Sequence, residues 1–182
     1  WHAQRPCIWT MSLWRRWKWP VRGGSRTRSE FVHIQIDDPA RPDVFALLEA
    51  HLRSMYELSP PESVHALDVN GLKRPEITFW TVREGSLLVG CGALKEIDPQ
   101  HGEVKSMRTP QALRRRGAGR AMLEHIVQEA RRRGYVRLSL ETGSMEGFKP
   151  ACTLYESVGF EYCGPFDQYQ PDPNSLFMTL VL

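Results

Sequence analysis

The sequence predicts a mixed α/β fold (α+β, with a mixed sheet) in a single domain, with the element order βααβββαβαββ. Short β-branched and aromatic runs between turn residues indicate the strands. Apolar residues at i, i+3, i+4 and i+7 indicate amphipathic helices between them. The 182-residue chain shows no internal repeat and no linker to a second domain, so we expect residues 30–182 to form one domain with a sizeable core.

Residues 1–29 differ in composition from the rest of the chain. They hold five of the six tryptophans and seven basic side chains, with no acidic one. One interpretation is a basic, aromatic arm that touches a membrane surface or nucleic acid. The interpretation we favour is an extension that is disordered or not native to the protein. It lacks the apolar core of a secretory signal.

Charge and cysteine usage narrow the possible partners. Outside the extension the chain carries 17 basic and 21 acidic side chains, which gives no reason to expect binding to nucleic acid. Cys7, Cys91, Cys152 and Cys163 show no C-x-x-C spacing and no histidine pair has zinc-finger spacing, so no metal is expected. Reduced thiols, a cytoplasmic location and no membrane partner are expected, since no apolar run is long enough to span a bilayer.

The first part of the domain reads as one strand and two helices. Residues 31–36 alternate between apolar and polar, as a half-buried strand does. Residues 42–56 have helical apolar spacing, and Pro42 suits the first turn of a helix. Residues 62–67 follow a Ser-Pro-Pro start signal and predict a short second helix, with Asn70-Gly71 marking the turn after it.

Three antiparallel strands are expected next. Residues 77–82 are β-branched and aromatic, residues 83–86 form a hairpin turn, and residues 87–94 form the returning strand. Two glycines within this returning strand would weaken it unless another group has to approach its backbone closely. A second turn at residues 98–102 leads into a third strand at residues 103–109.

The second half continues as helix, strand, helix and two strands. The first of these helices carries its apolar face on Met122, Leu123, Ile126, Val127 and Ala130. Gly134 stands where a C′ cap belongs, after a run of arginines that suits the negative end of a helix dipole. Residues 135–140 then read as a strand and residues 150–158 as a helix, and the closing strands are expected at residues 160–163 and 176–182.

An Arg/Gly turn stands between the third antiparallel strand and the long helix. Such a turn exposes backbone N–H groups at the positive end of a helix dipole, which favours phosphate. No Lys-Ser or Lys-Thr follows the glycines, as a nucleoside-triphosphate loop requires, and Met122 stands where a dinucleotide fingerprint needs a small residue. The remaining pattern is R-x-x-G-x-G, formed by Arg114, Gly117 and Gly119. Its structural alternative is an ordinary arginine-rich helix start.

The element order, this hexad and the segment Leu154-Tyr155-x-x-x-Gly159-Phe160 resemble the GNAT superfamily of N-acetyltransferases, over residues 31–182. The resemblance implies a mostly antiparallel mixed sheet, flanked by helices and splayed at a bulge where acetyl-CoA is bound as cosubstrate. It implies that the turn amides bind the pyrophosphate and that the backbone of the preceding strand pairs with pantetheine. The implied coenzyme positions are Met107, Arg108, Thr109, Arg114, Arg115, Arg116, Gly117, Ala118, Gly119, Arg120 and Cys152.

The resemblance also implies catalytic roles. Tyr155 would protonate the leaving thiolate, its alternative being a plain core residue of its helix. The backbone N–H of Met107 would stabilise the oxyanion. From the strand positions, Glu103 is our candidate base, and an ion pair with Lys105 is its equally weighted alternative; Glu141, at the end of the following strand, is a second acidic candidate. Strand alternation places Glu103, Lys105 and Met107 on one face.

The acceptor is expected between the first two helices and the last hairpin loop. The positions expected around it are His51, Met55, Tyr56, His65, Glu141, Asp172 and Asn174. Phe148 departs from the family pattern, because many members carry Asn there to contact the pantetheine region. The segments at residues 140–143 and 172–175 resemble those of a bacterial subgroup that acts on small amines or amino acids.

The predicted function is therefore acetyl transfer from acetyl-CoA to the primary amine of a small molecule. Two alternatives stay open: acetylation of a protein N-terminus or lysine, and a non-catalytic CoA-binding regulatory module. The expected partners are acetyl-CoA and a small amine, and a homodimer is left open. Neither nucleic acid nor membrane is expected as a partner.

Overall fold

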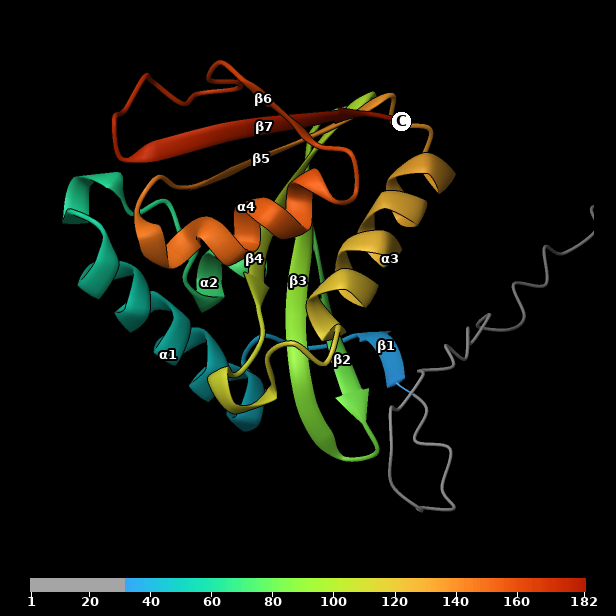
Figure 1. Cartoon of the computed structure of the whole chain (residues 1–182). Helices are drawn as coiled ribbons and strands as arrows, with labels where there is room; N and C mark the ends of the chain where they lie inside the picture. The colour runs from blue at the N-terminus through green and yellow to red at the C-terminus, as the bar shows by residue number, and fades with distance from the viewer. Residues whose placement is uncertain (1–31) are drawn as a thin grey trace, which may run out of the picture.

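The computed structural model describes residues 32–182, so the extension predicted at residues 1–29 lies outside the described part of the chain. The strands are β1 Val32–Ile36, β2 Ile77–Glu84, β3 Leu87–Asp98, β4 His101–Arg108, β5 Arg137–Gly143, β6 Glu161–Cys163 and β7 Ser175–Val181. They form one mixed sheet in the order β1-β2-β3-β4-β5-β7-β6 (Figure 1). Within residues 32–182 the predicted order of strands and α-helices is confirmed.

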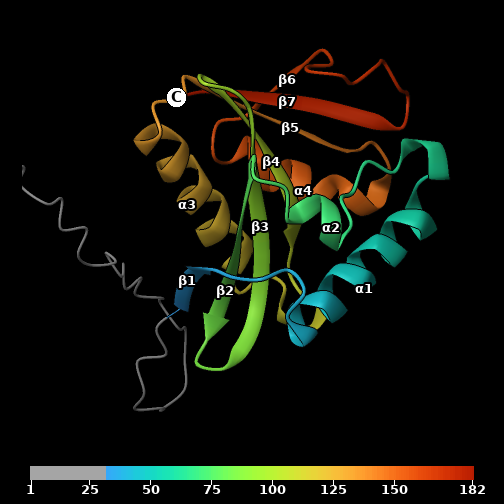
Figure 2. The same ribbon diagram turned by 180° about the vertical axis from the view of Figure 1, so that it is seen from behind.

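The α-helices are α1 Pro42–Leu58, α2 Val69–Leu72, α3 Ala118–Arg132 and α4 Lys149–Glu156, with short 3₁₀ turns at Pro61–Ser63, Gln111–Leu113 and Glu146–Phe148. Two buried clusters cover the two faces of the sheet. The larger joins α3 and α4 to Trp80, Leu94 and Leu138, and the smaller joins α1 and α2 to Cys91 and Ala93. Figures 1 and 2 accordingly show α1 and α3 on opposite sides of β3.

The second helix lies later in the chain than predicted. The segment 62–67 forms only the 3₁₀ turn Pro61–Ser63, and α2 instead contains Asn70 and Gly71, which were predicted as a turn. Asp68 explains this shift, because its side chain accepts a hydrogen bond of 2.7 Å from the Gly71 N–H. An aspartate that caps the third N–H in this way starts a helix directly after itself.

The centre of the sheet opens between β4 and β5. These strands are parallel, and they pair only from His101–Glu103 to Arg137–Ser139. Beyond Glu103 and Ser139 each strand continues for several residues without pairing to the other. The two strands therefore diverge toward their carboxyl ends, which confirms the predicted splay of the sheet.

A β-bulge interrupts β4 at Ser106. Cys91 of β3 pairs with Arg108. The next pair joins Ala93 to Lys105, so two β4 residues stand opposite a single β3 residue. Ser106 has a φ of 53°, in the left-handed region. One extra residue in a strand bends it and re-aims the side chains that follow.

The bulge moves Met107 to the other face of the sheet. Strict alternation predicted Met107 on the face of Lys105, and Arg108 on the opposite one. If Gly92 carried a Cβ, that atom would lie 2.7 Å from the Met107 Sδ and 2.7 Å from the Met122 Cγ of α3, so both methionine side chains cover Gly92 from the α3 face. Met107 therefore packs toward α3, while Arg108 shares the α1 face with its pairing partner. The prediction from strict alternation was wrong because it assumed a regular strand, without the extra residue of the bulge.

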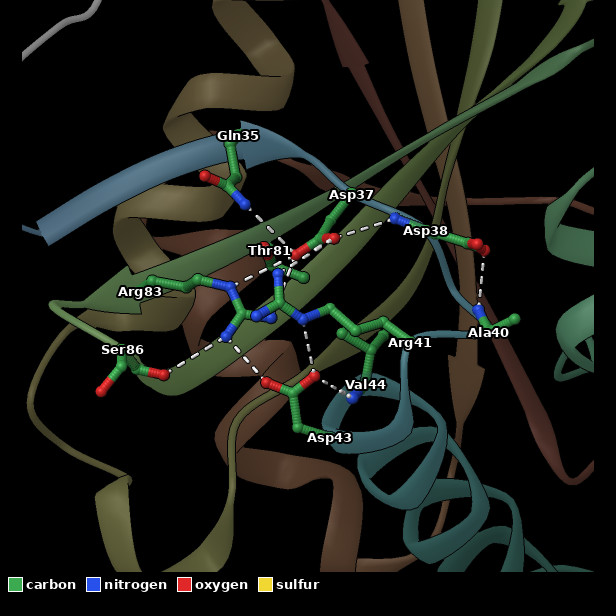
Figure 3. Close-up of polar contacts among 10 residues, drawn as sticks. All are labelled: Gln35, Asp37, Asp38, Ala40, Arg41, Asp43, Val44, Thr81, Arg83 and Ser86. Carbon is green, nitrogen blue, oxygen red and sulfur yellow. Dashed lines mark hydrogen bonds and ion pairs between the residues drawn. The ribbon is translucent and has the colours of Figure 1, made fainter.

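A buried arginine fixes the start of α1 (Figure 3). The Arg83 side chain is 5% exposed and donates to Asp37 Oδ2 at 3.0 Å and to Asp43 Oδ2 at 2.8 Å. Thr81 donates a further hydrogen bond of 2.8 Å to Asp37. Burial pushes the pKa of Asp37 up, but the hydrogen bonds that it accepts, from Thr81 and Arg83 first and also from the Asp38 N–H and Gln35, together outweigh it, so this pKa lies below its ordinary value. The network joins β2 to the β1–α1 connection.

Candidate active site

A cavity of about 790 Å³ lies where β4 and β5 diverge. Its walls come from α1, the segment after α1, the ends of β4 and β5, the Arg/Gly turn and α4. This volume lies within the range of sites that hold small-molecule ligands. The cavity therefore brings the predicted coenzyme and acceptor positions to one place.

The Arg/Gly turn opens directly onto this cavity. Gly117 is the N-cap of α3 with a φ of 80°, and no side chain caps the first turn of the helix. The N–H groups there are left for a ligand, at the positive end of a 15-residue helix. A Cβ at Gly119 would stand 3.4 Å from Leu154 Cδ2, so α4 packs directly against the turn.

Most of the predicted coenzyme positions line the cavity. They are Met107, Arg108, Thr109, Arg114, Arg115, Gly117, Ala118, Gly119 and Arg120. Arg116 and Cys152 are absent from the cavity wall. Cys152 is buried within α4, and Arg116 is an exposed residue of the turn.

Tyr155 lines the cavity from α4 and is 7% exposed. Its ring packs beside Phe160, with ring centroids 6.0 Å apart. Burial raises the pKa of Tyr155, and the nearby Cys152 and Glu141 raise it further. The phenol therefore stays protonated at neutral pH, which is the state that a proton donor requires.

Glu103 lies beside the cavity rather than in its wall. It is 1% exposed, and its Oε1 accepts hydrogen bonds from Lys105 Nζ at 2.7 Å and from the Tyr169 hydroxyl at 2.6 Å. Lys95 Nζ stands 3.7 Å from Glu103 Oε2. The ion pair with Lys105 is therefore present. Tyr169 was missed by the sequence analysis, and no local pattern in the loop between β6 and β7 pointed to it.

Glu141 does line the cavity, from the end of β5. Its Oε1 accepts a hydrogen bond of 2.7 Å from Ser175 Oγ. Burial raises the pKa of Glu141, an effect that the Ser175 hydrogen bond and the charges of His65 and Lys105 only partly offset. A carboxylate with a raised pKa is a better proton acceptor than an exposed one.

The other predicted acceptor positions divide into two groups. His51, Met55 and His65 line the cavity together with Glu141. Tyr56, Asp172 and Asn174 do not line it. Tyr56 is 53% exposed, and Asn174 instead holds its loop to Ser63 through an Nδ2–Oγ hydrogen bond of 3.2 Å. Phe148, at the position where Asn was expected from the resemblance, is buried and forms part of the cavity wall.

Two further features concern metals and membranes. Within residues 32–182, no three His, Cys, Asp or Glu side chains are grouped as a metal site. In the same part of the chain, no helix combines the length and the apolar character needed to cross a membrane.

A mixed sheet that splits between parallel central strands, with a helix N-terminus and a buried tyrosine at the split, is the arrangement expected of an acetyltransferase of the class that uses acetyl-CoA. The chain belongs to the Acetyltransferase (GNAT) family, whose sequence model matches residues 44–160. The resemblance inferred from the Arg/Gly turn and the Leu-Tyr segment is thereby confirmed, and the chain is an N-acetyltransferase.

Similar proteins agree with this assignment. Over 151 residues the chain is 57% identical to the uncharacterized N-acetyltransferase YsnE of Bacillus subtilis, a match that covers 83% of this chain and 100% of the relative. It is 40% identical over 152 residues to the IAA acetyltransferase of Azospirillum brasilense, covering 83% and 98% of the two chains. A Bacillus subtilis acetyltransferase solved in complex with CoA has the same fold, with a TM-score of 0.62, 16% identity and coverage of 83% and 99%.

Proposed function

We propose that this acetyltransferase transfers the acetyl group of acetyl-CoA to the primary amine of a small molecule, by direct attack of the amine on the thioester. The observation that carries the proposal is that Tyr155 and Glu141 line one cavity, where β4 and β5 separate. One side chain can give a proton and the other can take one, as aminolysis of a thioester requires.

The coenzyme half of the proposal rests on the turn before α3. Backbone N–H groups from Gly117 onward bind the pyrophosphate, and Arg114 and Arg115 add positive charge beside it. The backbone of residues 107–109 pairs with the pantetheine arm along the open edge of β4. This arrangement brings the thioester to the split between the strands, within the cavity that Tyr155 lines.

The chemical step needs one proton acceptor, one oxyanion donor and one proton donor. Glu141 takes a proton from the ammonium group, directly or through water, and the free amine attacks the thioester carbon. The backbone N–H of Met107 binds the oxyanion as the N–C bond forms. The C–S bond then breaks and Tyr155 protonates the CoA thiolate. The attacking nitrogen gives up its second proton, through water, to the tyrosinate that remains, and Glu141 releases its proton to solvent. Glu103, the sequence-based candidate, is less favoured as the base because its Oε1 already binds Lys105 and Tyr169.

The acceptor side favours a small molecule over a peptide. The loop between β6 and β7 approaches the segment after α1, where the His65 and Tyr169 rings pack edge to face at 5.1 Å. Asn174 holds the same loop to Ser63. These contacts hold the loop against Ser63 and His65, which line the cavity, so a fixed wall rather than an open groove faces the acceptor, and acetylation of a protein N-terminus or lysine is the second candidate. The Azospirillum brasilense relative is named for IAA, so IAA belongs among the compounds to test.

A screen of small amines with thiol-release detection tests the proposal. It pairs purified protein and acetyl-CoA with single amines, IAA and short peptides that carry a free N-terminus or lysine. We expect thiol release that depends on a small amine, with the acetylated product found by mass spectrometry. Release only with peptides would favour the second candidate. Binding of acetyl-CoA without release with any amine would contradict both.

A further inference from the structure

Arg108 presents a charged side chain to the cavity from the end of β4. Its backbone pairs with Cys91, and directly opposite residues of antiparallel strands point their side chains to the same face. Cys91 packs in the cluster formed with α1. The bulge at Ser106 therefore directs the Arg108 side chain toward α1 and away from α3.

The Arg108 guanidinium has no counter-ion within residues 32–182. No ion pair or side-chain hydrogen bond of the described residues involves it, and its Nε is buried without a hydrogen-bond partner. Its charged neighbours are basic: burial lowers the pKa of Arg108, and the charge of Arg114 lowers it further. A half-buried cation without a partner is costly in a folded protein, which calls for an anion from outside the chain.

The cavity wall offers little to neutralise this charge. Glu141 is the one acidic residue in the wall among residues 32–182, and its Oε1 already accepts from Ser175. Lys105 is paired with Glu103, whereas Arg108 stays unpaired. The cavity therefore contains one basic position on the α1 face that no internal acid satisfies.

His51 stands near Arg108 and also lacks a hydrogen-bond partner. Burial lowers the pKa of His51 to about 4, and the charge of Arg108 contributes to this shift. The imidazole is therefore neutral at pH 7, and its Nδ1 is buried without a partner. A neutral ring with an N–H can donate to an anion beside the guanidinium without adding a second charge.

Two anions could reach this position: a phosphate of the coenzyme or a charged group of the acceptor. The helix dipole and Gly117 belong to α3, on the opposite face of the sheet from α1. The charge of Arg114 in the turn reaches Arg108, but the Arg108 side chain lies on the α1 face, and Met55 and His65 line the same cavity. The position of Arg108 on the α1 face therefore favours the acceptor over the coenzyme as the source of the anion.

From this placement, and resting on the proposed function, we infer that the acceptor carries a carboxylate in addition to its amine, and that Arg108 binds this carboxylate with His51 beside it. The planar guanidinium matches a carboxylate with two parallel hydrogen bonds. The backbone of Arg108 serves the coenzyme and its side chain serves the acceptor. Amines without an acidic group leave the guanidinium unpaired and react slowly.

Matched acceptor sets test this inference on the unmodified protein. Each set holds an amino acid, its carboxamide and the amine that lacks the carboxyl group, so only the charge or the group itself changes. We expect kcat/KM to be about 30-fold to 1,000-fold lower for the carboxamide and the plain amine, as loss of one partner of a buried charge pair implies. The effect should fall mainly on KM.

Variants assign the preference to Arg108. Arg108→Gln should abolish the discrimination between carboxylate and carboxamide, and Arg108→Lys should keep part of it. The affinity for acetyl-CoA, measured by calorimetry, should stay within about threefold in both variants, because the pyrophosphate is bound elsewhere. The control is Arg132→Gln, since that arginine is exposed on α3 and pairs with Glu129 outside the cavity.

The results of these experiments distinguish a failure of the carboxylate inference from a failure of the proposed function. Equal kcat/KM for carboxylate, carboxamide and plain amine would overturn the inference and leave small-amine acetylation standing. A large loss of acetyl-CoA affinity in Arg108→Gln with acceptor discrimination intact would assign the side chain to the coenzyme instead. No acetylation of any amine, with acetyl-CoA bound, would overturn the proposed function and the inference with it.

Discussion

At the residue scale, Tyr155 is the proposed proton donor to the leaving thiolate. We expect Tyr155→Phe to lower kcat by about 100-fold to 10,000-fold, the usual contribution of a positioned acid. Acetyl-CoA affinity should change little, because the ring that packs beside Phe160 remains. The matched control is Tyr162→Phe, which removes an exposed hydroxyl that binds Glu156. Normal turnover in Tyr155→Phe would exclude the tyrosine as the acid.

Glu141 and Glu103 can be distinguished by pH dependence. Because burial raises the pKa of Glu141, the carboxylate loses its basic form as pH falls through a value above the ordinary 4.5. The pH profile of kcat/KM should therefore show an acid limb, and Glu141→Gln should remove that limb and lower kcat/KM by about 100-fold or more. A limb that persists in Glu141→Gln and disappears in Glu103→Gln would assign the base to Glu103.

The site was partly predictable at this scale. Tyr155 and the Arg/Gly turn were predicted because each belongs to a pattern of neighbouring residues. Tyr169 contacts Glu103 across 66 positions, and Thr81 contacts Asp37 across 44. Contacts of this kind depend on how loops return to the sheet, which no local spacing in the sequence encodes.

At the element scale, the Arg83 network anchors α1, which forms one wall of the cavity. Arg83→Met would remove the buried cation beside Asp37 and leave only the half-exposed Arg41 at 3.8 Å, so we expect unfolding free energy to fall by about 3 kcal/mol. The control Lys73→Met breaks an exposed pair with Asp38 and should change it by about 0.5 kcal/mol or less. Chemical denaturation measures both.

The stability that Arg83→Met loses should depend on pH in a defined direction. The folded pKa of Asp37 lies below its ordinary value of 3.8, so the stabilisation is present above that value and is lost as pH falls through the folded pKa. The difference between wild type and Arg83→Met should therefore be largest near neutral pH and shrink below about pH 3.8. A difference that is small at pH 7, or constant down to pH 2, would contradict the role of the network.

Element boundaries were predicted less well than element order. The strands and long helices follow from runs of apolar residues, which sample a large part of each element. The bulge at Ser106 and the cap at Asp68 each depend on one residue and its partner. Because the bulge decides which face Met107 and Arg108 occupy, a single extra residue changed the predicted site more than any error in helix length.

At the scale of the whole molecule, function follows from the split of one sheet. The faces carry different clusters, with α3 and α4 on one side and α1 and α2 on the other. The Arg/Gly turn belongs to the α3 side, and the Arg108 side chain with His51 to the α1 side. The gap between β4 and β5 lies between the two sides, where we propose that the thioester binds. The order of elements predicted this arrangement, whereas the acceptor depends on side chains that long-range contacts place.

The central claim is that the Arg/Gly turn binds acetyl-CoA at this split, and calorimetric titration with acetyl-CoA tests it most directly. We expect wild type to bind, and Gly117→Val and Gly119→Val to bind at least about tenfold more weakly, because side chains there disturb the N–H groups that hold the pyrophosphate. The control is Gly85→Val, which changes another positive-φ glycine in the hairpin after β2. Absence of binding by wild type, or equal affinity in wild type and both turn variants, would contradict the account.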